Sequence, residues 1–373
     1  MIYLDNAATT KPSKAAVDAM LLTAECFGNP SSLHGLGLEA EKIINNSKKT
    51  IADILNVNEK FIYFTSGGTE ANNTAIFGTA YDRIKSGKHL ITTKIEHPSV
   101  LEAFKKLENE GFDVTYLTPQ SDGRISLGEL SDALREGTTL VSVMHVNNET
   151  GVIQPIDKIK PLMKEKAPKA VLHCDCVQSF GKIDIKPQKW GIDMISISAH
   201  KIHGFKGTGA LYASNKIKPL IYGGEQQNEV RPGTENIGGI AAFAAAAEEC
   251  RISSQKMTEF RNKMIELLLD CPDIKINGST EYNSGSVLNV SFIGIKAEIL
   301  LHALEAHKIY VSTGSACSSH KPQPSHVLTA MGLNQKEING AIRISFDENT
   351  TETEIEEASE IIKKETANIR RYM

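Results

Sequence analysis

Strand-like apolar runs alternate with helical or loop segments over much of the chain, and few folds accommodate that order. The runs are Phe61–Phe64, His89–Thr93, Val114–Leu117, Leu140–His145, Ala170–Asp175 and Met194–Ser198. Alternation of this kind predicts an α/β domain with a mostly parallel sheet flanked by helices. We place this large domain over residues 16–255.

Beyond Arg251 the pattern changes, because helices are interspersed with short strands. The expected helices lie at about Met257–Leu269, Ala297–Ala306 and Glu352–Ile369, and the expected strands at Ser286–Phe292 and Ile342–Phe346. This mixture predicts a smaller α+β domain, which we build from residues 1–15 and 256–373.

The composition is that of an ordinary globular protein, with 40% hydrophobic and 23% charged residues among 373. A net charge of −4 gives no indication of direct binding to nucleic acid or to a membrane. No apolar run approaches the ~20 residues of a membrane span. The N-terminus lacks the basic region and apolar core of a signal peptide, and six irregularly spaced cysteines make no disulfide framework. We therefore expect a cytoplasmic protein.

Polar clusters follow several of the predicted strands, at the end where ligands bind to sheets of this class. The clusters are Glu96–Pro98, Asn147–Gly151, Asp175–Gln178 and Ser198–Lys201. The carboxyl ends of parallel strands meet at one edge of a sheet, so these clusters predict a single site.

Lys201 follows a strand and precedes a Gly-rich segment, where its amine can be held over a site. A partly desolvated lysine has a lowered pKa and can form a Schiff base. Most lysines merely solvate a surface, so the assignment depends on the residues around it.

Pyridoxal 5′-phosphate (PLP) has an aldehyde for Lys201, a phosphate, and a ring nitrogen that needs a carboxylate. Asp175 suits the nitrogen, and His97 can stack on the ring or transfer protons. The remaining candidates are Gln178 and Asn148 for the phenolic oxygen, and Gly68, Thr69, Ser198 and His200 for the phosphate. The simpler interpretations are a turn aspartate, a helix-start histidine and a plain helix N-cap at 65–72.

Nine short motifs in collinear order resemble those of the cysteine desulfurases, the NifS/IscS-like branch of the class V aminotransferase superfamily. They are Asp-Asn-Ala-Ala-Thr-Thr, Gly-Asn-Pro-Ser-Ser, Thr-Ser-Gly-Gly-Thr-Glu, Glu-His, Val-Asn-Asn-Glu-Thr-Gly, Asp-x-x-Gln-Ser, Ser-Ala-His-Lys, Arg-x-Gly-Thr-x-Asn and Gly-Ser-Ala-Cys-Ser-Ser. The resemblance runs from Tyr3 to about Arg343. It implies the fold-type I architecture, with a seven-stranded sheet in the large domain.

The resemblance also implies PLP as cofactor and L-cysteine as substrate. It implies that Lys201 forms the Schiff base, that His97 stacks on the ring, and that Asp175 meets the pyridine nitrogen. Asn148 and Gln178 then lie near the phenolic oxygen. Members of the family are homodimers in which a threonine, here Thr234, reaches the cofactor phosphate of the partner.

Cys317 lies among small residues, which suits a loop that brings a thiolate to the substrate. Its attack on the sulfur of cysteine would leave a persulfide on Cys317 and release alanine. Arg343 matches the family's arginine for the substrate carboxylate, a task that suits a bidentate guanidinium; the alternative is a surface ion pair. We expect Asn148 to bind the substrate as well. We expect the remaining lone cysteines, Cys26, Cys250 and Cys271, to be small hydrophobes.

The sequence departs from the family at three places. Cys176 stands where a small residue is usual, which predicts an extra thiol near the ring. The segments 224–230 and 347–349 are also atypical. We expect no metal site in His173–Cys176, because adjacent strand residues point to opposite faces. The sequence ends soon after its last helix, and we expect it to lack the longer tail with which some relatives engage an iron–sulfur scaffold.

The sequence therefore predicts a PLP-dependent L-cysteine desulfurase that supplies sulfur to an acceptor protein, either an iron–sulfur scaffold or a tRNA-thiolation enzyme. The alternatives are a class V aminotransferase, a selenocysteine lyase and a non-catalytic sulfur-relay partner. An aminotransferase has no need of Cys317.

Overall fold

Seven strands form one mixed sheet in the computed structural model, which describes residues 1–215, 217–250, 254–313 and 324–372. The strand order is β2-β8-β7-β6-β5-β3-β4. The bounds are β2 (Ile62–Thr65), β3 (His89–Thr93), β4 (Asp113–Leu117), β5 (Thr138–Ser142), β6 (Val171–Asp175), β7 (Met194–Ser198) and β8 (Gly209–Ala213). Strands β4, β3, β5, β6 and β7 pair in parallel, whereas β8 is antiparallel to both of its neighbours. The mostly parallel sheet predicted from the alternation is confirmed.

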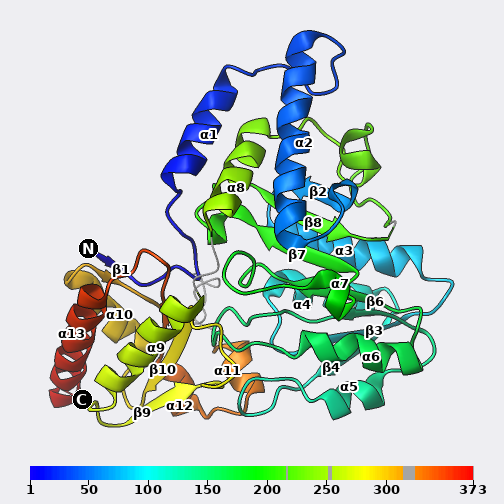
Figure 1. Cartoon of the computed structure of the whole chain (residues 1–373). Coiled ribbons are helices and arrows are strands. Elements are labelled where there is room, and N and C mark those ends of the chain that lie inside the picture. Colours follow the sequence, from blue (N-terminus) through cyan, green and yellow to red (C-terminus); the bar gives the residue numbers. More distant parts are fainter. Residues whose placement is uncertain (216, 251–253, 314–323, 373) are drawn as a thin grey trace.

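Helices cover both faces of this sheet, which explains why its strands are apolar runs rather than alternating ones. The helices α2 (Gly35–Leu55), α5 (Leu127–Ala133), α6 (Ile156–Lys166) and α8 (Ile237–Glu249) enclose one apolar cluster. The helices α3 (Gly68–Asp82) and α4 (Pro98–Asn109) enclose another on the opposite face. Figure 1 shows α2 and α8 side by side, near β2, β8 and β7.

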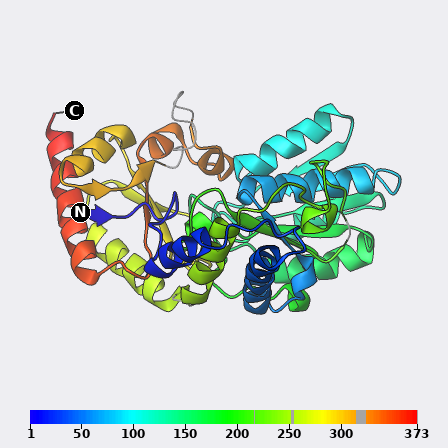
Figure 2. The same cartoon turned by 90° about the horizontal axis from the view of Figure 1, so that it is seen from above.

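A smaller body has its own core and its own antiparallel sheet, ordered β12-β13-β10-β9. Its strands are β9 (Ile274–Asn277), β10 (Val287–Phe292), β12 (Ser312–Thr313) and β13 (Ala341–Ser345). The helices α9 (Ser254–Leu268), α10 (Ala297–Ala306) and α13 (Glu352–Arg371) pack on it. Figure 2 shows the two bodies side by side. The domain boundaries given above stay a prediction.

The N-terminal segment joins the small body before it reaches the large one. Strand β1 (Ile2–Tyr3) pairs in parallel with β11 (Ile309–Tyr310), and Asp5 forms a bridge with Ser345 at the end of β13. The chain then runs to α1 (Lys14–Ala24), which packs against α8. The segment between Asp5 and α1 therefore crosses the junction of the two bodies.

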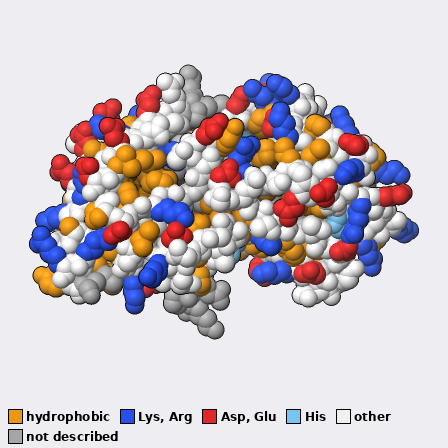
Figure 3. Space-filling view, turned by 90° about the horizontal axis from the view of Figure 1, so that it is seen from below, with side chains coloured by type: hydrophobic (Ala, Val, Ile, Leu, Met, Phe, Trp, Pro, Cys, Tyr) orange, Lys and Arg blue, Asp and Glu red, His pale blue; other side chains and the backbone are white. Residues whose placement is uncertain are grey.

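The remaining elements are short: η1 (Glu59–Phe61), α7 (Pro187–Trp190), η2 (Ala199–Lys201), η3 (Gln226–Glu229), α11 (His326–Ala330) and α12 (Gln335–Asn339). None of the helices in the described part of the chain combines the length and hydrophobicity needed to cross a bilayer. On the face seen in Figure 3, acidic and basic side chains are interspersed, as the small net charge leads one to expect.

Candidate active site

The carboxyl ends of β6 and β7 lie side by side and bring the central candidates together. Asp175 is the last residue of β6 and Ser198 the last of β7, and these strands are direct neighbours. Lys201 ends the short helix η2 that follows Ser198. The edge predicted from the polar clusters is therefore where these side chains meet.

The amine of Lys201 is held by two backbone carbonyls of the N-terminal segment. Its Nζ donates to the oxygen of Ala7 at 2.6 Å and to that of Ala8 at 2.7 Å. Nε2 of Gln178 donates to the same Ala7 oxygen at 2.9 Å. The segment 7–8 thus fixes the position of the lysine and places Gln178 beside it.

Asp175 is buried, and both of its carboxylate oxygens accept hydrogen bonds. Oδ2 accepts from Nδ2 of Asn72 at 2.7 Å, and Oδ1 accepts from the backbone N–H of Val177 at 2.9 Å. These bonds orient the carboxylate as an acceptor on the α3 side of the sheet.

His97 is the N-cap residue of α4, and its ring is tied back to that helix. Its Nδ1 accepts from the backbone N–H of Ser99 at 3.1 Å and lies 2.8 Å from the Ser99 hydroxyl. Burial lowers the pKa of His97; Asp175 opposes this shift, whereas Lys201 reinforces it. Burial therefore favours the neutral form of the ring.

The N-terminus of α3 meets the ends of β6 and β7, as an anion site requires. A Cβ on Gly68 would lie 2.7 Å from Cγ2 of Val177 and 3.7 Å from Cβ of Ser198, so glycine permits this close approach. Thr69 follows in the first turn. His200 lies nearby in sequence, with Nδ1 3.2 Å from Oγ1 of Thr9, and burial and then the Lys201 charge lower its pKa to about 4.

Arg343 lies in β13 with a buried side chain directed at the junction. Nη2 donates to Oδ1 of Asp5 at 2.8 Å, and Nη1 donates to the backbone oxygen of Asn148 at 3.0 Å. Its Nε is buried without a partner among the described residues. This geometry joins Arg343 to Asn148, the two residues expected to bind the substrate, and it is not that of a surface ion pair.

One predicted residue cannot be placed relative to this cluster, and another lies apart from it. Cys317 lies outside the described residues. Thr234 is exposed in the loop before α8, and the contacts recorded for the described residues do not join it to Lys201 or Asp175. Its assigned partner is a second copy of the chain, which fits that exposure.

Cys176 differs from the expectation of an extra thiol near the ring. It is fully buried in the apolar cluster under α2, α6 and α8, whereas Asp175 binds Asn72 on the other side of the sheet. Neighbouring residues of an extended chain point to opposite faces, so the side chain that follows Asp175 enters the core. Of the three lone cysteines, Cys271 is buried, but Cys26 and Cys250 are partly exposed.

The residues present fit PLP, on observations independent of the family. The helix α3 offers its N-terminus to a phosphate, Lys201 offers a primary amine, and Asp175 offers an oriented carboxylate. Oε1 of Gln178 is buried without a partner in the described residues, so a polar group in the site would satisfy it. Lys201, His97, Asp175, Gln178, Gly68 and Thr69 would hold the cofactor.

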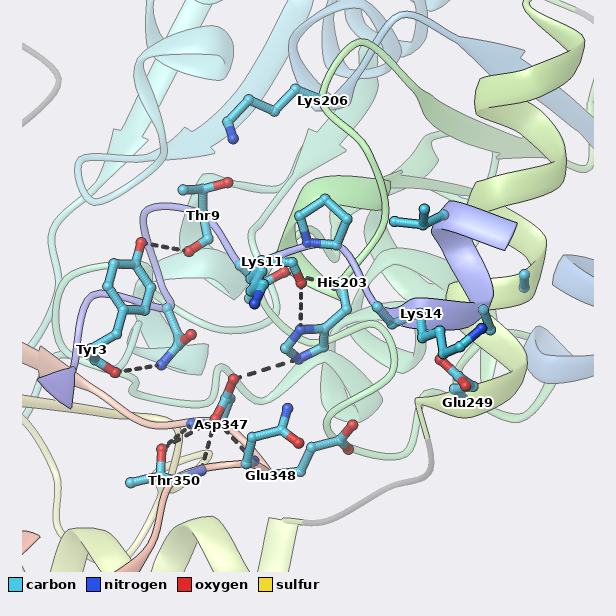
Figure 4. A pocket seen from close by; sticks show the side chains of 18 of the residues that line it. Tyr3, Thr9, Lys11, Lys14, His203, Lys206, Glu249, Asp347, Glu348 and Thr350 are labelled. Carbon is cyan, nitrogen blue, oxygen red and sulfur yellow. Dashed lines mark hydrogen bonds and ion pairs between the residues drawn. The ribbon is translucent and has the colours of Figure 1, made fainter. Parts of the chain in front are cut away.

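A cavity of about 1560 Å³ is lined in part by residues of the N-terminal segment, among them Tyr3, Thr9 and Lys11 (Figure 4). Lys201, Asp175 and His97 do not line it. His203 does, and its ring bridges the Lys11 carbonyl at 3.0 Å and the Asp347 carboxylate at 3.6 Å. The cavity is therefore distinct from the candidate active site.

The atypical segments have structural roles. Asp347 accepts hydrogen bonds from the backbone N–H groups of Asn349 and Thr350, and so closes the turn after β13. In the 224–230 segment, Oε1 of Gln227 accepts from the backbone N–H of Phe64 at 2.9 Å and covers the outer edge of β2. Both residues stabilise loops and lie outside the Lys201 cluster.

Sequence reasoning missed Asp5, Asn72, and the carbonyls of Ala7 and Ala8. Asp5 and Ala7 belong to a motif that was noticed but given no role. Asn72 lies one turn after Gly68 on α3, on the face that meets β6, and that spacing was the available signal.

Comparison with known proteins identifies the family of this chain. The sequence matches the aminotransferase class-V family over residues 2–357. It is 42% identical to the cysteine desulfurase IscS of Methanosarcina thermophila, over 99% of this chain and 93% of that protein. It is 41% identical to the cysteine desulfurase IscS of Clostridium botulinum, over 97% and 94%.

Solved structures give the same result. A NifS-like protein superposes with a TM-score of 0.92 at 36% identity, covering 98% of this chain and 99% of that one. The structure of SspA in complex with cysteine superposes with a TM-score of 0.83 at 37% identity, over 93% and 99%. The chain belongs to the class-V aminotransferase family, in the branch formed by the cysteine desulfurases.

Proposed function

We propose that the protein is a PLP-dependent L-cysteine desulfurase that converts L-cysteine to L-alanine. The observation that carries the proposal is the convergence of a lysine, a carboxylate and a histidine at one sheet edge, with an arginine of the small body held by the same N-terminal segment that holds the lysine. When bound, PLP supplies the electron sink that stabilises negative charge at the substrate α-carbon.

The chain's own residues then have distinct tasks. The N-terminus of α3 and Ser198 would bind the phosphate, and Asp175 would accept a hydrogen bond from the protonated ring nitrogen. Arg343, held by Asp5, binds the carboxylate of L-cysteine with its guanidinium. Lys201 holds the cofactor through its amine and moves the α-proton when that amine is free.

Cys317 is the proposed acceptor of the sulfur. Its Sγ forms a bond to the sulfur of L-cysteine while the Cβ–S bond of the substrate breaks. The electron pair of the broken bond and one proton end on that carbon, which becomes the methyl group of alanine. The thiol of Cys317 becomes a persulfide, so the atoms of enzyme and substrate balance without an oxidant.

The persulfide would pass to an acceptor protein, an iron–sulfur scaffold or a tRNA-thiolation enzyme, in the cytoplasm. We also propose a homodimer. Large apolar side chains are exposed on α1, on the start of α2 and on the loop between them: Leu21, Leu22, Phe27, Leu33, Leu36 and Leu38. A second copy that covers this surface could bring its own Thr234 to the phosphate.

The test is alanine production from L-cysteine by the purified protein with a thiol reductant, beside Cys317→Ser. Alanine from the parent alone supports the proposal, and alanine from both proteins overturns the role of Cys317. An amino-group transfer to a keto acid would instead indicate an aminotransferase. Faster turnover of L-selenocysteine than of L-cysteine would indicate a selenocysteine lyase. Bound cofactor without turnover, even with an acceptor protein present, would indicate a sulfur-relay role.

A further inference from the structure

A buried amide on α3 connects two groups of the site that come from different elements. Asn72 is 1% exposed, and its Nδ2 lies 2.7 Å from Oδ2 of Asp175 and 2.9 Å from Oγ of Ser99. An amide nitrogen carries two N–H donors, so one serves the strand β6 and the other the helix α4. The reverse orientation would set the amide oxygen against the Asp175 carboxylate.

The bond to Ser99 determines where the hydroxyl proton of Ser99 points. Because Oγ of Ser99 accepts from Asn72, its own O–H is available for Nδ1 of His97, 2.8 Å away. Nδ1 also accepts the backbone N–H of Ser99. A ring nitrogen that accepts two hydrogen bonds carries no proton, so the proton of neutral His97 is on Nε2.

We propose that Asn72 is a positioning residue that orients Asp175 as an acceptor and, through Ser99, fixes His97 in the Nε2–H tautomer. In this arrangement a single amide acts on Asp175 directly and on His97 through Ser99. With Nδ1 engaged, His97 offers a proton donor rather than a base on its remaining nitrogen. The catalytic meaning of this inference rests on the proposed function. The tautomer of His97 can be measured whether or not the protein is a desulfurase.

Three variants separate the two connections of Asn72, one directly to Asp175 and the other through Ser99 to His97. Asn72→Ala removes both connections, Ser99→Ala removes only the connection to His97, and Asn73→Ala is the matched control. Asn73 is the next residue of α3, and its Nδ2 binds the backbone oxygens of Thr69 and Ser99 without touching Asp175. Asn72→Leu keeps the size of the side chain without either donor if the alanine variant does not fold.

The first readout is the ¹⁵N spectrum of labelled histidine in the protein without cofactor, with His97 assigned through His97→Gln. We expect the Nε2–H pattern in the parent and in Asn73→Ala, and a mixture of tautomers in Ser99→Ala and Asn72→Ala. The second readout is PLP affinity from the absorbance of bound cofactor. We expect a loss of about tenfold in Asn72→Ala and less than threefold in Ser99→Ala, because only the former leaves Asp175 with one donor.

An unchanged His97 pattern in both Ser99→Ala and Asn72→Ala overturns the inference, and so does PLP affinity that falls equally in all three variants. The proposed function fails differently. The parent protein could bind PLP and show the expected tautomer of His97 but make no alanine. This result would refute the desulfurase proposal, while the positioning role of Asn72 would stand. A parent that binds no PLP sinks the cofactor assignment, while the histidine spectrum still decides the inference.

Discussion

Arg343 and Asp5 form an ion pair with Nη2 and Oδ1 2.8 Å apart, although 338 positions separate them in the chain. The arginine side chain is 5% exposed and the aspartate 21%. The bridge between Asp5 and Ser345 and the bond from the Ser345 N–H to the Leu4 carbonyl hold the two segments together. The guanidinium that is proposed to bind the substrate is therefore oriented by a residue of the N-terminal segment.

Asp5→Asn should raise the KM for L-cysteine by about tenfold and change kcat less than threefold. The asparagine can still accept one hydrogen bond, but the charge that fixes Arg343 is lost, and a charge-assisted bond is worth about 1.5–3 kcal/mol. Steady-state alanine production measures both constants.

Asp273→Asn is the matched control, because Asp273 forms an exposed ion pair with Arg370 at 3.0 Å and exposed pairs contribute little. The control should leave KM unchanged. A fall in kcat with unchanged KM in Asp5→Asn would contradict a role in substrate binding.

Glu96 should make the protein less stable as the pH rises from about 4.5 to about 8. Burial raises its pKa from 4.5 to about 8; hydrogen bonds from the Met144 N–H and the Thr93 hydroxyl oppose this shift, and the Asp175 charge adds to it. The folded state therefore holds a proton that the unfolded state has released in this range. The free energy of unfolding falls by up to about 1.4 kcal/mol per pH unit.

Glu96→Gln cannot release a proton, so its unfolding free energy should fall less steeply over the same range. Urea unfolding at pH 5, 6, 7 and 8 measures the slope. Glu102→Gln, at an exposed position of α4, should keep the slope of the parent. Equal slopes in all three proteins would show that Glu96 is ionised in the fold.

Leu33→Asp should convert the proposed dimer into a monomer. Leu33 is 94% exposed in the loop before α2, and a charge there would be desolvated in an interface. Sedimentation velocity measures the mass. Leu269→Asp, at a leucine 66% exposed after α9, should remain dimeric. A parent protein that sediments as a monomer would refute the proposal itself.

Cys176→Ala should retain alanine production within about twofold, because the thiol lies in the core and not among the Lys201 contacts. The loss of a buried sulfur should cost about 1 kcal/mol of stability. Cys317→Ser should abolish the activity at unchanged stability. A cooperatively folded Cys176→Ala protein without activity would assign Cys176 to the reaction.

The sequence predicted the central part of the site because local patterns determine it. Asp175 ends one recognisable strand and Lys201 closely follows another, and parallel strands end at one edge. The side of the sheet on which Cys176 lies follows from the same alternation. To place Cys176 in the core from the sequence, one must know at which residue β6 ends. The ends of elements are the least certain part of a sequence-based prediction.

The partners of those residues were not predictable in the same way. Asn72 is one polar position on a helix, and its role depends on how α3 packs against α4 and β6. Asp5 meets Arg343 only because β1 pairs with β11 and the bridge at Ser345 follows. Such contacts depend on tertiary packing between distant segments, which periodicity does not encode.

The pairing of β1 with β11 also affects how the enzyme is made. Ile2 and Tyr3 leave the ribosome long before Ile309 and Tyr310 exist, and the sheet around Lys201 can form in the interval. The ion pair between Asp5 and Arg343 can likewise form only once β13 has been translated. The nascent chain can therefore fold its large sheet early, but Asp5 acquires its arginine partner only near the end of synthesis.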